Sequence, residues 1–301
     1  MIITNKHNLP GYFVELLNKQ YPPKPGRISV TDLIAPPLIR HLKVQHWDEL
    51  AEDVADRLWM FLGTMGHAVM EKTDLENALA EEKLEIKISD AWTLVGKFDR
   101  LKDGCLVDFK FTTVWSYVFG DKPEWESQMN VYAWMLRQTG FDVKQLVIDA
   151  IYRDWSKRKA HEDNYPPIPF ARTCLPMWPA ADAAEYIDYR LTLHLNPAMH
   201  PCTPEEMWEK PTQYAVMKPG RKSAVRVLDT EDEAKARAES EGKGCFVQER
   251  PGERTRCKDY CPVRAVCPNN IYRENDREND RENDRENDNG VADKTHGAAA
   301  A

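Results

Sequence analysis

The sequence has no apolar run close to the roughly 18 residues that a membrane-spanning helix needs. Its first residues, MIITNKHNLPGYF, lack the pattern of a secretory signal. A glycine-rich phosphate loop, a nucleotide-binding fingerprint and a Ser-His-Asp arrangement are missing as well. We therefore expect a soluble protein without membrane contact, located in the cytoplasm, or in the host cytoplasm if a phage encodes it.

Positive charge is also scarce, because the 301 residues carry a net charge of −8. This balance argues against a protein that coats nucleic acid nonspecifically. Basic residues nevertheless gather at 153–159, 218–226 and 250–258. Each of these clusters could contact a phosphate backbone or could be solvated surface.

The segment 96–110, GKFDRLKDGCLVDFK, predicts a β-hairpin that carries two carboxylates and a lysine. Asp103-Gly104 is a strong signal for a two-residue turn between apolar runs. With that turn Lys102 opposes Cys105, and the same register sets Asp99 opposite Asp108. Opposed side chains lie only about 5 Å apart, and like charges there destabilise a sheet. We therefore expect a divalent cation, Mg²⁺ or Mn²⁺, between the two carboxylates.

Side chains alternate along a strand, so Lys110 shares a face with Asp108. We expect Phe98, Val107 and Phe109 on the other face, in the core. An ammonium beside the metal could orient an attacking water or help to deprotonate it. A surface hairpin with solvated charges is the alternative.

Residues 47–81 predict a helix on which apolar residues recur every three to four positions, at Leu50, Val54, Leu58, Leu62, Met65 and Val69. Gly63, His67 and Glu71 follow one stripe of this helix. We expect the small Gly63 to allow close approach to the sheet and Glu71 to support His67. A lone histidine on a helix could equally be structural.

Three further elements flank the hairpin. Residues 83–88 alternate as a strand that carries Glu85, either near the site or facing solvent. Residues 123–138 predict a helix with Gln128 and Tyr132 one turn apart, and Tyr132 could alternatively be a buried structural residue. Residues 144–152 form an apolar run that suits a buried strand.

Four motifs in this order resemble the PD-(D/E)XK nuclease superfamily, specifically its RecB-like branch, which includes CRISPR-associated exonucleases and phage recombination nucleases. The motifs are GxxxH at 63–67, GxxD at 96–99, DxK at 108–110 and QxxxY at 128–132, within a likeness that extends over 29–267. The resemblance implies that His67, Asp99, Asp108 and the carbonyl of Phe109 coordinate the metal and that Lys110 acts on water and phosphate. It also implies that Gln128 and Tyr132 line the catalytic cleft, with Glu85 nearby.

The fold implied by the resemblance is α/β, with a restriction-endonuclease-like core in which helices flank a mixed central sheet. The function implied is a metal-dependent DNA nuclease, most often an exonuclease in recombination, repair or phage DNA metabolism. Three alternatives stay open: an endonuclease, an RNA nuclease with the same chemistry, and a noncatalytic nucleic-acid-binding or scaffold protein. DNA, single- or double-stranded, is the expected partner, and a helicase or a single-strand annealing protein could act with it.

Four regions follow from the composition. We expect the nuclease core at 1–160, an irregular and helical covering segment at 161–211, and a small ββαβ unit with a cysteine module at 212–270. REND repeats fill 273–288 and contain no apolar residue, so we expect 271–301 to be disordered.

The cysteine module contains Cys257, Cys261 and Cys267, spaced C-x3-C-x5-C. Without an export signal such clustered thiols suggest metal binding rather than disulfides, although free structural thiols are the alternative. Some RecB-like nucleases hold an iron-sulfur cluster with three C-terminal cysteines and one near the N-terminus, but Pro36 and Pro37 stand here where that distant cysteine is expected. Cys245 is a candidate fourth ligand, so a [4Fe-4S] cluster and a Zn²⁺ site are both conceivable. We take Cys105, Cys174 and Cys202 as ordinary core or loop residues.

Overall fold

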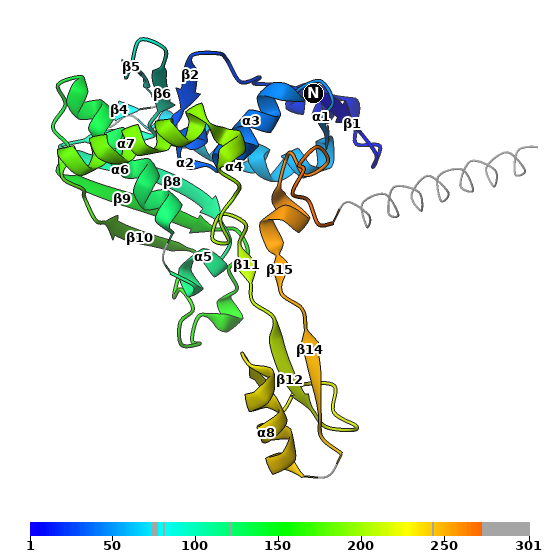
Figure 1. Ribbon diagram of the computed structural model, residues 1–301. Coiled ribbons are helices and arrows are strands. Elements are labelled where there is room, and N and C mark those ends of the chain that lie inside the picture. The colour runs from blue at the N-terminus through cyan, green and yellow to red at the C-terminus, as the bar shows by residue number, and fades with distance from the viewer. Residues whose placement is uncertain (74–77, 81, 121, 243, 273–301) are drawn as a thin grey trace, which may run out of the picture. The chain divides into compact units, whose positions relative to one another are not determined.

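A computed structural model of the chain (Figure 1) describes residues 1–73, 78–80, 82–120, 122–242 and 244–272. The expectation of disorder covers 271–301, of which 273–301 lie outside the described residues. These residues fall into two compact units, Met1–His200 and the chain from Pro201 onward. Within the described part, no helix combines the length and the apolarity that crossing a membrane requires.

A five-stranded mixed sheet organises the first unit, in the order β10-β9-β8-β7-β4. Its strands are β4 (Ala78–Ala80), β7 (Arg100–Lys102), β8 (Cys105–Thr112), β9 (Gln145–Tyr152) and β10 (Phe170–Leu175). The central pair β8-β9 is parallel and the other pairs are antiparallel. This sheet, with helices packed against it, confirms the predicted α/β class.

Two smaller sheets complete the strands of this unit. One contains β5 (Lys83–Lys87), β6 (Thr93–Lys97) and β2 (Arg27–Ser29) in the order β2-β6-β5, and the other pairs β1 (Ile2–Thr4) with β3 (Ala51–Asp53). The helices and single helical turns are α1 (Gly11–Leu17), α2 (Val30–Ile34), α3 (Pro37–Gln45), η1 (Val54–Arg57), α4 (Leu58–Glu71), α5 (Trp115–Val118), α6 (Pro123–Gln138), η2 (Lys157–Lys159), α7 (Ala180–Leu195) and η3 (Pro197–Met199).

The helix predicted over 47–81 is shorter than expected, because its first part pairs with the N-terminal strand. Asp53 accepts hydrogen bonds from the hydroxyl of Thr4 at 2.8 Å and from the backbone N–H groups of Lys6 and Ala55 at 2.8 and 3.0 Å. These contacts hold residues 51–53 extended, and α4 begins only at Leu58. The helix predicted over 123–138 has the bounds of α6.

The two faces of the central sheet bury different sets of side chains. Leu106 and Ile148 belong to the main core, to which α6 contributes Val131 and Met135. On the other face Val107, Phe109 and Val147 form a smaller cluster with Met70 of α4. The alternation along β8 therefore separates a face toward α6 from a face toward α4.

The end of α2 depends on two side chains of α7. Pro36 and Pro37 follow this helix and have no N–H groups, so the carbonyls of Asp32 and Leu33 lack their usual donors four residues later, and the last carbonyls of the helix have no helical donor. Arg190 supplies donors instead, to the carbonyls of Leu33, Ile34 and Ala35 at 2.9, 3.2 and 2.5 Å. The ring of His194 lies 3.1 Å from the same Leu33 carbonyl, and burial lowers the pKa of His194 to about 4.

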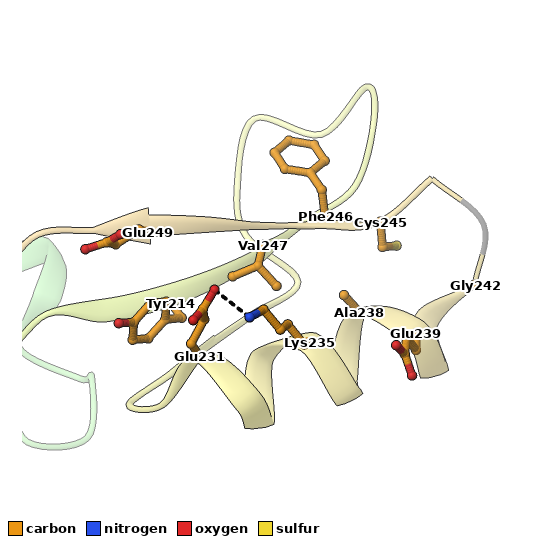
Figure 2. A pocket seen from close by; sticks show the side chains of 10 residues that line it. All are labelled: Tyr214, Glu231, Lys235, Ala238, Glu239, Gly242, Cys245, Phe246, Val247 and Glu249. Atoms are coloured by element: carbon orange, nitrogen blue, oxygen red, sulfur yellow. Dashed lines mark ion pairs between the residues drawn. The ribbon is translucent and has the colours of Figure 1, made fainter.

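The second unit contains the predicted ββαβ arrangement. Strands β12 (Gln213–Met217), β13 (Arg226–Leu228) and β14 (Phe246–Arg250) form a sheet in the order β13-β12-β14, and α8 (Glu231–Glu241) packs on it through Ala234 and Ala238. Figure 2 shows Lys235 and Glu231 paired on this helix, at 2.8 Å. A short pair, β11 (Glu209–Lys210) with β15 (Glu253–Arg254), precedes the turn η4 (Arg256–Tyr260).

Candidate active site

The turn of the predicted hairpin is present between β7 and β8. Asp103 and Gly104 both have positive φ, 52° and 79°, as a type I′ turn requires. Lys102 pairs with Cys105, which confirms the predicted register next to the turn. The expectation that Asp99 lies directly opposite Asp108 is wrong, because the two are not paired in the ladder. The ladder ends at Arg100 and Val107, however, because β6 belongs to another sheet and the chain is irregular at 98–99.

This break changes the surroundings of Asp99 and Phe98. Asp99 lies outside the ladder and accepts a hydrogen bond from the backbone N–H of Phe109 at 2.7 Å. Phe98 packs in the main core, whereas Val107 and Phe109 belong to the cluster on the α4 face. The expectation that these three side chains share one face is therefore wrong for Phe98, since the alternation does not continue through an irregular segment.

Asp108 is a buried carboxylate, only 5% exposed, on the sheet face toward α6. Burial raises its pKa to about 6; the charge of Lys110 opposes this increase and the charge of Asp99 adds to it. Lys110 Nζ lies 2.7 Å from Asp108 Oδ2. That contact is an ion pair whose angles are poor for a hydrogen bond, and it lowers the pKa of Asp108 only in part. The site thus holds a negative charge that its present neighbours do not fully compensate.

Lys110 connects the hairpin with α6. Its Nζ donates to Gln128 Oε1 at 3.0 Å, and the hydroxyl of Tyr132 interacts with the Gln128 side chain and the Lys97 backbone. Burial raises the pKa of Tyr132 to about 12, and the charge of Asp108 contributes to this increase. The structure therefore brings Lys110, Gln128 and Tyr132 together next to Asp108, as the four motifs predict.

Position 96 requires a glycine, because Tyr132 packs directly against its backbone. A Cβ atom at this position would lie 2.5 Å from Tyr132 Cε1 and 2.9 Å from Val30 Cγ2. Both neighbours are buried and cannot move freely. The first residue of the GxxD motif thus maintains the position of the tyrosine.

We expect Gly96→Ala to displace Tyr132, and with it the contact to Gln128. The free energy of unfolding should fall by about 1–3 kcal/mol, the usual cost of overpacking a core. Any catalytic activity of this site should fall about tenfold or more, because catalysis depends on sub-ångström positioning. Gly11→Ala is the matched control, since nothing lies within 4 Å of the corresponding Cβ position. Urea denaturation and initial cleavage rates measure both effects, and equal behaviour of the two variants would contradict this role of Gly96.

His67 approaches Asp99 from α4, with Nδ1 3.3 Å from Oδ1. Together with Glu71 and Lys97 these two residues line an open cavity of about 340 Å³. Glu71 is therefore near His67, as expected. The close approach of the helix to the sheet occurs at Gly66, where a Cβ would lie 2.2 Å from the ring of Phe111. The expectation for Gly63 is wrong, because nothing lies within 4 Å of its Cβ position.

Glu85 is engaged elsewhere. Its Oε1 lies 2.6 Å from Arg27 Nη2 and 2.6 Å from Lys83 Nζ. Hydrogen bonds from Arg27 and Lys83 lower the pKa of Glu85 to about 2. The structure thus places Glu85 in a surface ion pair with Arg27 rather than with Asp99 and Asp108. Arg27 is far away in sequence, which is why the strand pattern alone did not reveal this partner.

The donor set around Asp108 suits a hard divalent cation. Asp99, Asp108 and the Phe109 carbonyl offer oxygens, and His67 offers a ring nitrogen. The buried Asp108 Oδ2 without a hydrogen bond is the observation that favours such an ion. Within the described residues, no three His, Cys, Asp or Glu side chains already have metal-site spacing. The residues therefore have the chemistry that such an ion requires. In this structure Lys110 contacts the Asp108 carboxylate, and the Phe109 N–H contacts the Asp99 carboxylate.

The cysteines of the second unit group differently from the expectation. Burial raises the pKa of the Cys202 thiol to about 12, and Glu206, Cys261, Cys257 and Cys267 all contribute to this increase. Cys245 instead packs against the cluster between α8 and its sheet, directly before the first residue of β14. It also lines the pocket in Figure 2. The five residues of β14, about 16 Å long, lie between Cys245 and the last residue of this strand, after which the chain continues to the cysteine trio. The Cys202 thiol thus interacts electrostatically with the trio and Cys245 does not, although within the described residues no three of these thiols have metal-site spacing.

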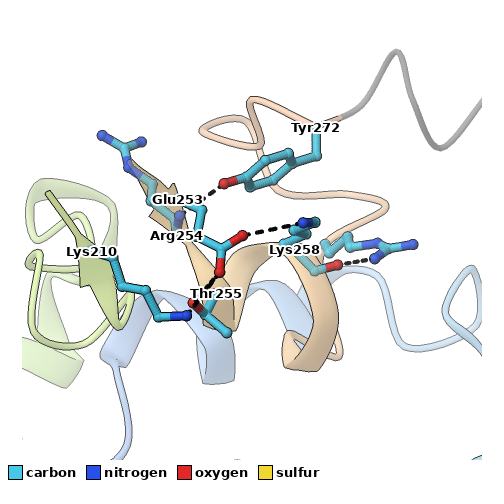
Figure 3. A network of polar contacts seen from close by, with 7 residues as sticks. Lys210, Glu253, Arg254, Thr255, Lys258 and Tyr272 are labelled. Atoms are coloured by element: carbon cyan, nitrogen blue, oxygen red, sulfur yellow. Dashed lines mark hydrogen bonds and ion pairs between the residues drawn. The ribbon is translucent and has the colours of Figure 1, made fainter. Parts of the chain in front are cut away.

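Local contacts hold Cys202 near the trio. The backbone N–H of Arg256 donates to the Met207 carbonyl at 3.1 Å, and the rings of Trp208 and Tyr260 lie 5.5 Å apart. Figure 3 shows Glu253 between Lys210 and Lys258, with contacts of 2.9 and 3.2 Å. Sequence spacing could not identify Cys202, because 54 residues and the whole β12–α8–β14 unit separate it from Cys257.

Three comparisons place these features among known proteins. A family model described as the PD-(D/E)XK nuclease superfamily matches residues 24–268. No curated protein matches the chain. The crystal structure of SSO0001 is similar at 15% identity and a TM-score of 0.46, covering 86% of this chain and 93% of that one. An alkaline exonuclease (LHK-Exo) from Laribacter hongkongensis is similar at 13% identity and a TM-score of 0.36, covering 58% of this chain and 91% of that one.

Proposed function

Because the chain belongs to the PD-(D/E)XK nuclease superfamily, we propose that it is a metal-dependent deoxyribonuclease whose site is Asp99, Asp108, Lys110 and His67. Membership in the superfamily implies hydrolysis of a nucleic acid. The single observation that carries the proposal is the buried Asp108 beside Asp99, with Lys110 Nζ at 2.7 Å. A binding protein has no need for two neighbouring carboxylates of this kind, which destabilise the fold when they stand alone.

Each side chain has a definite part in this proposal. Asp99, Asp108, the Phe109 carbonyl and His67 would hold Mg²⁺ or Mn²⁺, which when bound activates water and stabilises the charge that develops on the phosphate. Lys110, which donates to Gln128 at 3.0 Å, positions its ammonium next to the same carboxylate. From there it can orient the attacking water or contact a phosphate oxygen. Gln128 and Tyr132 maintain this orientation from α6.

The test compares the protein with Lys110→Ala on end-labelled single- and double-stranded DNA, with and without magnesium. We expect magnesium-dependent degradation by the unaltered protein and a loss of about 10²–10³-fold in the variant, the usual cost of removing one group that stabilises the transition state. Equal, metal-independent behaviour of both proteins would instead indicate a noncatalytic binding or scaffold protein. Degradation of labelled RNA rather than DNA in the same assay would indicate an RNA nuclease.

Exonuclease action is the finer part of the proposal, and the likeness of the four motifs to RecB-like nucleases supports it. An enzyme that needs an end leaves covalently closed circles intact and degrades the same DNA after linearisation. We therefore expect circular single-stranded and relaxed duplex DNA to survive under conditions that consume the linear forms. Cleavage of circles at a comparable rate would indicate an endonuclease. Roles in recombination, repair or phage DNA metabolism, with or without a helicase or annealing partner, rest on the same likeness.

We also propose that the cysteine trio binds a metal centre with Cys202 as the fourth ligand. Protein purified without oxygen should show a broad absorbance near about 400 nm that fades on reduction if the centre is an iron-sulfur cluster, or be colourless with bound zinc. Cys202→Ala should lose the absorbance or the zinc. Cys245→Ala is the matched control and should retain it. Loss in Cys245→Ala alone would contradict the assignment, and metal-free protein in every case would indicate structural thiols.

A further inference from the structure

Helix α4 exposes an apolar surface that its position in the fold does not explain. None of its fourteen residues is buried, although the helix is rich in apolar side chains. Trp59, Met60 and Val69 are 59%, 57% and 67% exposed. Of these exposed side chains, Trp59 lies on the same side of the helix as His67, about two turns away, which makes it a candidate for a binding surface.

One edge of α4 leads from the candidate site to Trp59. Trp59, Gly63 and His67 are spaced at i, i+4 and i+8, so they follow one side of the helix over about 12 Å. The middle position has no side chain, and nothing lies within 4 Å of where a Cβ would be. The helix surface between His67 and Trp59 is therefore not blocked by a side chain at Gly63.

The indole is held in place by Arg153, which follows β9. The guanidinium carbon of Arg153 lies over the Trp59 ring at 4.3 Å from its centroid. Arg153 is fixed in turn because its backbone N–H donates to the Thr112 carbonyl, at the end of β8, at 3.0 Å. One face of the ring is thus covered by a cation, and the indole remains more than half exposed.

A second aromatic group follows the last residue of β8. Trp115 and Phe119 stack on each other with ring centroids 5.4 Å apart, and they are 58% and 74% exposed. The backbone N–H of Val114 donates to Asp154 Oδ1 at 2.7 Å, which ties this segment to the residue after Arg153. Exposed aromatic rings therefore flank the carboxyl ends of both parallel strands β8 and β9.

A cluster of cations begins at Arg153, directly after β9, in a protein of net charge −8. Arg153, Lys157, Arg158 and Lys159 are exposed within seven residues. In the described part of the chain, none of the three residues of η2 forms an ion pair with an acidic side chain. An apolar partner protein would cover these charges without compensating them, whereas a phosphate backbone compensates them.

We propose that this surface, consisting of Trp59, Arg153, Trp115, Phe119 and the cations of η2, is a stacking platform for unpaired bases. The inference rests on the proposed function and specifies its substrate as a single strand, or a frayed end, that extends from the site past Gly63 to Trp59. Aromatic side chains accept the flat face of any base, but in a duplex those faces are covered by neighbouring bases. The protein therefore selects unpaired DNA through its bases and not through their sequence.

The test measures binding to the full chain in EDTA by fluorescence anisotropy, so that no hydrolysis is involved. The probes are a 20-nucleotide oligothymidylate, a 20-base-pair blunt duplex and an abasic oligonucleotide with the same number of phosphates. We expect the single strand to bind more tightly than the other two. Trp59→Ala should weaken binding of the single strand on the order of 10- to 100-fold and change the abasic affinity less than about twofold. Trp59→Phe should restore most of the loss.

Tyr189→Ala is the matched control, because Tyr189 is an equally exposed aromatic residue on α7, and it should change no affinity. Tighter duplex binding, or an unchanged affinity of Trp59→Ala, would overturn the proposal and assign the surface to a protein partner or a second copy. Base-dependent binding without any magnesium-dependent hydrolysis would uphold the platform and refute the proposed function. Magnesium-dependent hydrolysis together with an unchanged single-strand affinity of Trp59→Ala would uphold the proposed function and refute the platform.

Discussion

Asp108→Asn is expected to abolish hydrolysis while stabilising the metal-free protein. The amide has the same shape but cannot act as an anionic ligand, so activity should fall by about 10³-fold or more. The free energy of unfolding should rise by on the order of 1–3 kcal/mol at pH 8. The opposite signs of the two effects distinguish a residue retained for chemistry from one retained for folding.

The stabilisation follows from the charge balance around the carboxyl group. Lys110 is already in place at 2.7 Å, and yet the pKa of Asp108 is raised to about 6, since burial and Asp99 outweigh the ion pair. A carboxyl group with a raised pKa binds its proton more tightly in the folded state than in the unfolded state. Its ionisation therefore destabilises the fold above pH 6, and this penalty disappears as the pH falls toward 4. The difference between the two proteins should disappear over the same range.

Urea denaturation in EDTA at several pH values and cleavage rates in magnesium measure both quantities. Asp142→Asn is the control, because that carboxylate is exposed beside Lys144 and should affect neither. A variant that loses stability at pH 8 would show that the ion pair with Lys110 outweighs desolvation. A variant that keeps its activity would remove Asp108 from the catalytic site.

Arg190→Leu is expected to produce the largest loss of stability in the first unit. It donates three hydrogen bonds to the carbonyls of Leu33, Ile34 and Ala35 at the end of α2. The Leu33 carbonyl would otherwise need a donor at position 37, which is a proline without an N–H. The side chain is 8% exposed, so water cannot easily take its place. Leaving these carbonyls unsatisfied should cost on the order of 3–5 kcal/mol. Because α2 carries Val30, which packs against Gly96, activity at higher temperature should fall as well.

The measurement is thermal and urea unfolding of the full chain, with Arg190→Lys expected to recover part of the loss. Lys87→Leu serves as the control, since it removes an exposed cation that pairs with Asp90 and should cost less than about 1 kcal/mol. A loss below about 1 kcal/mol for Arg190→Leu would mean that the carbonyls find other donors. His194, at 3.1 Å from the Leu33 carbonyl, is the nearest one.

Much of the fold could be predicted wherever a local signal was decisive. Asp103 and Gly104 set the hairpin register, because few residues adopt positive φ in succession. Pro123 at the first turn and a regular apolar pattern predict α6 at its observed bounds. Strand β10, by contrast, has no clear alternation, and it forms because it pairs with β9 over six residues.

The candidate site divides in the same way. Asp108, Lys110, Gln128 and Tyr132 were predictable, since the first two are two positions apart on one strand and the last two lie one helical turn apart. For Glu85 and Cys245 the sequence left alternatives open, and the structure gives them Arg27 and the core between α8 and β12–β14 as neighbours, which no local pattern revealed. Cys202 was overlooked, since only the pairing of β11 with β15 brings it near Cys257.

The sequence by itself determined the turn, the periods of the main elements and the identity of the acidic and basic groups, because these depend on neighbours within a few residues. Only the tertiary structure decided that Asp99 leaves the ladder, that Gly66 rather than Gly63 touches the sheet, and that α4 keeps Trp59 exposed beside Arg153. Each of these depends on contacts between segments far apart in the chain. Such contacts are set by the packing of the whole unit, which no short window of residues encodes.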